Sequence, residues 1–74
     1  MGHKKKTKKA RAQIINEFLY KEVTRRQIEK LDTGVDRLYN VKALTNMLDD
    51  GTAIELSRRE ERYKIVHDDS NNWR

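Results

Sequence analysis

Apolar residues recur every three to four positions between residues 10 and 21, which is the spacing of one side of an α-helix. The stripe consists of Ala10, Ile14, Ile15, Phe18 and Leu19. It predicts an amphipathic helix whose apolar side faces a core, with Thr7 as its N-cap. Lysines crowd the first turn of this helix and oppose its macrodipole, so a bound phosphate would stabilise that end.

A second helix is expected from Arg25 to Leu31. Thr24 is a favourable N-cap, and Gln27 lies three residues later, as in a capping box. Val23 and Ile28 occupy the two positions of a hydrophobic staple around the same cap.

The residues after Leu31 predict a turn followed by a third helix. Gly34 can adopt the positive φ that such a turn requires, and Asp36 can cap a helix that ends at Gly51. Helical spacing predicts that Leu38, Val41, Leu44 and Leu48 face the core. The opposite side would then present Tyr39, Lys42, Ala43 and Asn46.

Alternating apolar and polar residues predict a β-hairpin between residues 52 and 67. A four-residue loop, Arg58 to Glu61, would pair Ser57 with Arg62. Ile54 would then face Ile65, Leu56 would face Tyr63, and Glu55 would face Lys64. Ser57 and Glu60 could instead cap a helix, but that helix would leave Ile54 and Leu56 on unrelated sides.

Together these elements predict an α+β fold, mainly α, with three short helices followed by a C-terminal β-hairpin. Residues 10–67 would form one small domain, preceded by a flexible basic arm at 1–9 and followed by a disordered tail at 68–74. Trp73 in that tail would fold back on the domain or anchor a partner.

Charge is distributed unevenly along the 74 residues. The net charge is +5, but six of the 17 basic residues lie within the first eleven positions, where no acidic residue occurs. The remaining 11 basic and 12 acidic residues leave the segment from Ala12 onward at −1. A dense basic arm favours binding to DNA or RNA phosphates, although a solubilising tail has the same composition.

The two helices around Gly34 resemble a helix-turn-helix, and with the hairpin they resemble a winged helix-turn-helix domain over Thr24 to His67. Glu29 and Lys30 depart from the usual apolar and small residues of that motif. A plain αα-hairpin would satisfy the same local signals. The resemblance implies a DNA-binding transcription regulator. Candidate nucleic-acid contacts are Lys4, Lys5, Lys6, Lys8, Lys9, Arg11, Tyr39, Lys42, Asn46, Arg58, Arg59 and Arg62.

Lys42 and Asn46 are residue types that read guanine and adenine, although an ordinary solvated helix would carry them too. Asp36 and Asp50, expected on the same side of that helix, would repel phosphate. Likewise, Glu60 and Glu61 would offset the arginines at the hairpin tip.

No enzymatic or metal chemistry is predicted. The chain has no cysteine, and His3 and His67 lack metal-ligand spacing, so we expect no catalytic residue, metal or cofactor. The absence of a long apolar run predicts no membrane span and a cytoplasmic or nucleoid-associated protein that is not secreted. In size, layout and lack of chemistry the chain is also similar to small phage-encoded proteins that bind and modify host RNA polymerase. The body would then contact a protein rather than DNA.

Overall fold

The computed structural model describes the backbone of residues 2–68 and the side chains of residues 5–68. Six elements follow one another: α1 (Gly2–Phe18), β1 (Glu22–Thr24), α2 (Arg25–Lys30), α3 (Arg37–Asp50), β2 (Ala53–Ser57) and β3 (Arg62–Ile65). This order confirms a small α+β fold, mainly helical, with a C-terminal hairpin.

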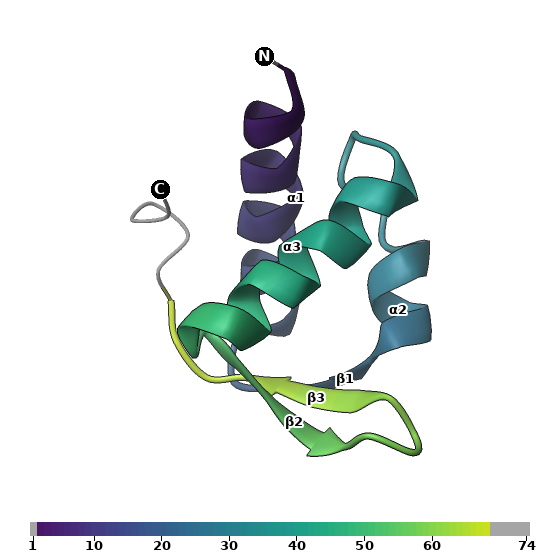
Figure 1. Ribbon diagram of the computed structural model, residues 1–74, viewed down its shortest axis with the longest axis vertical. Coiled ribbons are helices and arrows are strands. Elements are labelled where there is room, and N and C mark those ends of the chain that lie inside the picture. The colour runs from purple at the N-terminus through teal and green to yellow at the C-terminus, as the bar shows by residue number, and fades with distance from the viewer. Residues whose placement is uncertain (1, 69–74) are drawn as a thin grey trace.

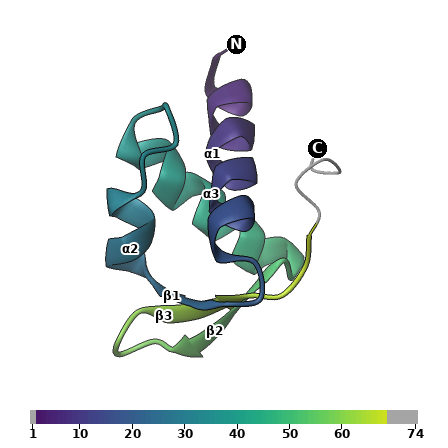
Figure 2. The same cartoon turned by 180° about the vertical axis from the view of Figure 1, so that it is seen from behind.

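The three helices stand on one side of a small sheet. In Figure 1, α3 crosses in front of α1, and α2 stands beside the first half of α3. The view from behind shows that the first turns of α1 and the turn between α2 and α3 lie at the same end, away from the sheet (Figure 2). Residues far apart in sequence therefore meet at that end.

The sheet contains one strand that the sequence does not predict. Its order is β1–β3–β2, with both pairs antiparallel. β1 is only three residues long, which is too short for an alternating pattern to be visible. Val23, interpreted as part of a hydrophobic staple, is also the buried centre of this strand and lies opposite Tyr63.

The predicted hairpin is present, but its register is partly wrong. Ser57 does lie opposite Arg62, and a bulge between Glu55 and Ser57 then shifts the remaining pairs by one residue. The observed pairs are Ala53 with Ile65, Ile54 with Lys64, and Glu55 with Tyr63. Because a one-residue shift exchanges the two sides of a strand, Ala53 is buried, whereas Ile54 and Leu56 are exposed.

The capping predictions for α2 and α3 are confirmed. The Thr24 hydroxyl accepts from Gln27 N, and the Gln27 side chain accepts from Thr24 N, which completes the capping box. The Asp36 side chain caps α3, and Gly34 and Gly51 have φ of 82° and 86°. The turns around α3 therefore follow from their local sequence.

The first helix runs from Gly2 to Phe18, so it ends three residues before the predicted end at Lys21. Its helical backbone includes the lysine run, and the flexibility of that basic arm stays a prediction. Thr7 is not an N-cap, because it lies inside the helix with 5% of its surface exposed. A run of lysines has no turn or breaker residue in it, and the lysine side chain is itself compatible with a helix.

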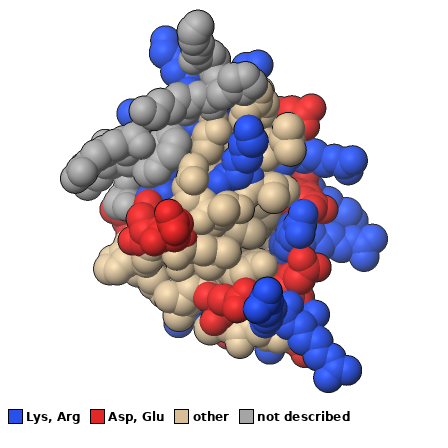
Figure 3. All heavy atoms as spheres, in the orientation of Figure 1, with Lys and Arg blue, Asp and Glu red and all other residues tan. Residues whose placement is uncertain are grey.

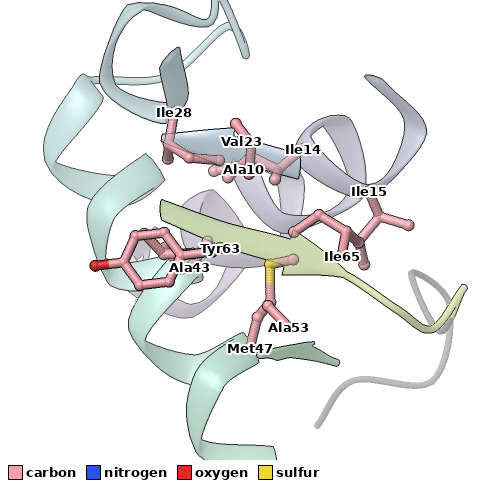
Figure 4. Packing of buried hydrophobic residues seen from close by; sticks show 11 residues of the cluster. Ala10, Ile14, Ile15, Val23, Ile28, Ala43, Met47, Ala53, Tyr63 and Ile65 are labelled. Atoms are coloured by element: carbon pink, nitrogen blue, oxygen red, sulfur yellow. The ribbon is translucent and has the colours of Figure 1, made fainter. Parts of the chain in front are cut away.

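Apolar side chains from every element meet in one core (Figure 4). Ile14 and Ile15 come from α1, Ile28 from α2, Met47 from α3 and Ile65 from β3. Complete burial of each such side chain contributes roughly 1.5–3 kcal/mol. The core fixes α1, α3 and the sheet relative to one another.

In the tail predicted at 68–74, only Asp68 is described, so the predictions of disorder and of a role for Trp73 lie outside the described residues. Within residues 2–68, no helix combines the length and apolar composition needed to cross a lipid bilayer.

Candidate nucleic-acid interface

The solvent-facing side of α3 differs from the predicted one. Asn40, Ala43, Leu44 and Met47 form the buried side of the helix. Ala43, predicted on the outer side, is therefore in the core, and Leu38, predicted to face the core, is 57% exposed. Because the helix turns about 100° per residue, Leu38, Lys42, Thr45 and Asp49 lie along the centre of the outer side. Asn46 is half-buried beside them.

Asn40 explains this rotation. Its side-chain nitrogen donates to the backbone oxygens of Ile28 and Leu31, each at 2.9 Å. The Thr33 hydroxyl donates to its side-chain oxygen at 2.6 Å. A polar residue thus takes a core position, since it satisfies the carbonyl groups at the end of α2. These bonds also fix the direction of α3 relative to α2.

Three predicted contact residues come together between α1 and α3. The Lys6 ammonium lies 5.4 Å from the centre of the Tyr39 ring, and the Lys42 ammonium lies 5.9 Å from it. Lys9 extends over the turn before α3, where its Nζ lies 3.0 Å from the position that a Cβ on Gly34 would occupy. We call Lys6, Lys9, Lys42 and Tyr39 the lysine cluster.

The cluster carries uncompensated positive charge. Among the side chains of residues 5–68, every ion pair involves an arginine, and none involves Lys6, Lys9 or Lys42. Lys5 and Lys8 are exposed elsewhere on α1, and the side chain of Lys4 lies outside the described ones.

Arg11 does not belong to the proposed set of phosphate contacts, because its side chain is completely buried. Its Nη2 lies 2.9 Å from Asp50 Oδ2 and donates to Thr52 Oγ1 at 2.7 Å. The spacing of Arg11 to Ile14 and Ile15 places it within the apolar stripe, and this was the signal in the sequence. Arg11 therefore joins α1 to the end of α3 and is not available to phosphate.

The acidic partner of this pair has a shifted pKa. Partial burial raises the pKa of Asp50, but hydrogen bonds from Thr52 and the charge of Arg11 outweigh that effect. The pKa of Asp50 therefore lies below its ordinary value, and its carboxylate stays charged to lower pH. Asp50 lies on the α1 side of the helix rather than on the outer side, so it does not oppose phosphate there.

Arginines and glutamates form a separate network between α2 and the hairpin. Arg25 pairs with Glu29 at 3.0 Å and with Glu61 at 3.3 Å. Arg62 pairs with Glu60 at 3.0 Å and lies 3.8 Å from Glu22. Hydrogen bonds to Glu61 and then to Glu29 raise the pKa of Arg25. We call these six residues the arginine–glutamate network.

The hairpin tip contains the remaining predicted cations. Arg58 and Arg59 are exposed and make no ion pair with any described side chain, in contrast to Arg62. Figure 3 shows the consequence for the surface: red and blue alternate along the edge over α2 and the hairpin, whereas the centre of the α3 side is largely uncharged.

A shallow hollow of about 300 Å³ separates α2 from α3. Its lining combines Arg25, Glu29, Asp36 and Arg37 with Leu38 and Val41. The mixture of charges and two apolar side chains is typical of a contact surface rather than of a catalytic pocket. No group of acidic, histidine or cysteine residues in the described part of the chain could hold a metal ion.

Comparison of the chain with protein-family models, with curated proteins and with solved structures gave no match.

Proposed function

We propose that this protein is a small DNA-binding module of the winged helix-turn-helix type that acts in transcription regulation. The order of α1, β1, α2, α3 and the β2–β3 hairpin supports this proposal, since such domains place a helix-turn-helix before a β-hairpin wing. In this reading α3 enters the major groove, and the hairpin tip contacts the sugar–phosphate backbone. DNA binding would place the protein in the cytoplasm or nucleoid.

One observation carries the proposal: α3 is held by Asn40 while its outer side remains open to solvent, between cations that have no acidic partner. Lys42 on that side can donate to bases or phosphates, and Leu38 can contact a thymine methyl group, whereas the Thr45 hydroxyl donates to Val41 O at 3.1 Å. The lysine cluster and the exposed Arg58 and Arg59 can reach the backbone. If the lysine cluster contacts one phosphate and Arg58 and Arg59 contact one each, the logarithm of the affinity should fall with log salt with a slope of about −2.7.

The test is fluorescence anisotropy of a labelled duplex between 50 and 200 mM salt. The slope above corresponds to an affinity loss of about 40-fold over this range. Thr45→Glu, on the outer side of α3, should weaken binding at least about tenfold through repulsion of phosphates. Gln13→Glu makes the same charge change on an exposed part of α1 and serves as the control.

The absence of binding at 50 mM salt would refute the proposal, and so would equal losses in the two variants. Deletion of residues 1–11 is not a usable test, because it removes Ala10 and Arg11 from the core. Substitution of exposed cations avoids that problem.

A protein contact is the second candidate function, favoured by the hollow between α2 and α3. Leu38 is exposed at its rim, and the charges around it are largely compensated. A host RNA polymerase or another nucleic-acid-handling complex would then be the partner. Affinity capture with the wild type and with Leu38→Glu should recover a polymerase or ribosomal subunit only with the wild type. Recovery of neither subunit would argue against this alternative.

A further inference from the structure

We propose that Lys6, Lys9 and Lys42, arranged around Tyr39, form one built phosphate-binding site rather than independent charges on an arm. That the phosphate belongs to a nucleic-acid backbone rests on the function proposed above. The site itself is an inference about anion binding and can be tested without DNA.

The lysines of the cluster converge from different parts of the chain. Lys6 and Lys9 come from α1, Lys42 comes from α3, and Gly34 lies in the turn between α2 and α3. The Lys9 side chain lies against Gly34, where any larger residue would displace it. Segments distant in sequence thus place Lys6 and Lys42 at the Tyr39 ring and Lys9 at the turn before α3.

The Tyr39 ring lies close to two of the three lysines. The ammonium groups of Lys6 and Lys42 lie 5.4 and 5.9 Å from the same ring centre, within the range of cation–π attraction. Tyr39 is half-buried and packs against the core, so the two cations have a fixed support. Both ammonium groups carry the same charge and lie near one ring, so an anion that contacts them would offset their mutual repulsion.

The carboxylates on either side of the turn accept hydrogen bonds from the backbone. Asp32 and Asp36 flank the turn; Asp32 accepts from Gly34 N at 3.1 Å, and Asp36 accepts from Leu38 N at 2.9 Å. Neither forms an ion pair with a lysine of the cluster among the described side chains. The ammonium groups of the cluster are therefore not held by a carboxylate among the described side chains, although both aspartates keep their negative charge.

The first test is an NMR titration with pyrophosphate. The Tyr39 ring and the lysine Cε groups of residues 6, 9 and 42 should shift together and saturate. The ring of Tyr20, which is 65% exposed and outside the cluster, is the internal control. Tyr39→Phe, which keeps the ring, should bind like the wild type, and Tyr39→Leu should bind weakly while circular dichroism shows a folded chain.

The second test is a double-substitution cycle for duplex binding with Lys6→Gln and Lys42→Gln. If one phosphate contacts both lysines, the double variant should lose less affinity than the product of the single losses, by at least about twofold. Lys5→Gln with Lys8→Gln is the matched control, since these exposed lysines lie outside the cluster. Their losses should multiply.

The outcomes separate this inference from the proposed function. Saturable pyrophosphate shifts without DNA binding would keep the site and remove the DNA-binding proposal. DNA binding with an unshifted Tyr39 ring and multiplicative losses for Lys6 and Lys42 would keep DNA binding and overturn the site. Failure of both titrations would overturn both.

Discussion

The lysine cluster and the arginine–glutamate network carry similar numbers of cations but differ in what surrounds them. In the network, Arg25 and Arg62 each lie within 3.0 Å of a glutamate oxygen. In the cluster, Lys6 and Lys42 lie against an aromatic ring, and no described carboxylate pairs with them. Exposed ion pairs contribute little stability, but they cancel the field that would attract a polyanion. Whether a cation is paired with a carboxylate therefore indicates if it can attract a polyanion, and its presence alone does not.

Substitution of Asn40 tests the buried hydrogen bonds that hold α3 against the end of α2. We expect it to cause the largest loss of stability among the substitutions proposed here. Asn40→Leu would remove a buried partner from the Thr33 hydroxyl, the Leu31 carbonyl and the Ile28 carbonyl, of which Ile28 O still accepts from Leu31 N. An unsatisfied group costs about 1–3 kcal/mol, so with two such groups the free energy of unfolding should fall by about 3–5 kcal/mol. Urea denaturation measures this loss. Thr33→Val, which removes one of these bonds, should cost about 1–2 kcal/mol, and equal losses would contradict the account.

The Arg11–Asp50 pair tests whether a cation that is paired with a carboxylate stabilises the fold, even in α1, the helix that also carries Lys6 and Lys9. Asp50→Ala removes the carboxylate beside a completely buried guanidinium. Breaking such a pair costs about 3–5 kcal/mol, and we expect about 3 kcal/mol because Asp50 is partly exposed. Asp49→Ala, at an exposed position without an ion pair among the described residues, should change stability by less than about 0.5 kcal/mol. Similar urea midpoints for the two variants would show that the Arg11–Asp50 pair does not stabilise the fold.

Lowering the pH tests the same ion pair by protonating the Asp50 carboxylate, without replacing the side chain. The pKa of Asp50 is lowered in the folded state, so its contribution to stability is present above the unfolded pKa and is lost as pH falls through the folded pKa. The wild type should lose more stability on acidification below about pH 4 than Asp50→Asn does. Thermal melts between pH 2 and 6 measure the difference. Parallel curves would contradict this assignment.

Leu38→Ser should have the smallest effect on the fold. Leu38 is 57% exposed, so its replacement should change the free energy of unfolding by less than about 0.5 kcal/mol. Urea denaturation provides this measurement. A large loss would show that Leu38 supports the core, as its spacing in the sequence predicts, and that the open side of α3 lies elsewhere.

Local signals in the sequence predict much of the fold. Thr24, Asp36 and Gly51 act through neighbours within a few residues, and their positions are confirmed. The predictions from sequence are wrong where a contact with a residue distant in sequence determines the local structure. The bulge in β2 depends on its pairing with β3, and the burial of Asn40 depends on the end of α2.

Prediction of the candidate site shows the same division. Counting charges assigns Arg11 to a basic arm, but Asp50 and Thr52, about forty residues away, bring it into the interior. The sequence predicts Lys6, Tyr39 and Lys42 as separate nucleic-acid contacts, and only the packing of α1 on α3 brings them together. Their grouping depends on tertiary contacts, which composition does not contain.

The salt dependence of duplex binding by two charge-matched double variants tests the central claim most directly. Lys6→Gln/Lys42→Gln and Arg25→Gln/Arg62→Gln each remove two positive charges. The account predicts that the lysine variant reduces the magnitude of the salt slope by about 1, the share of one phosphate contact, and that the arginine variant leaves the slope unchanged. A larger reduction in the arginine variant, or no binding by the wild type at 50 mM salt, would contradict it.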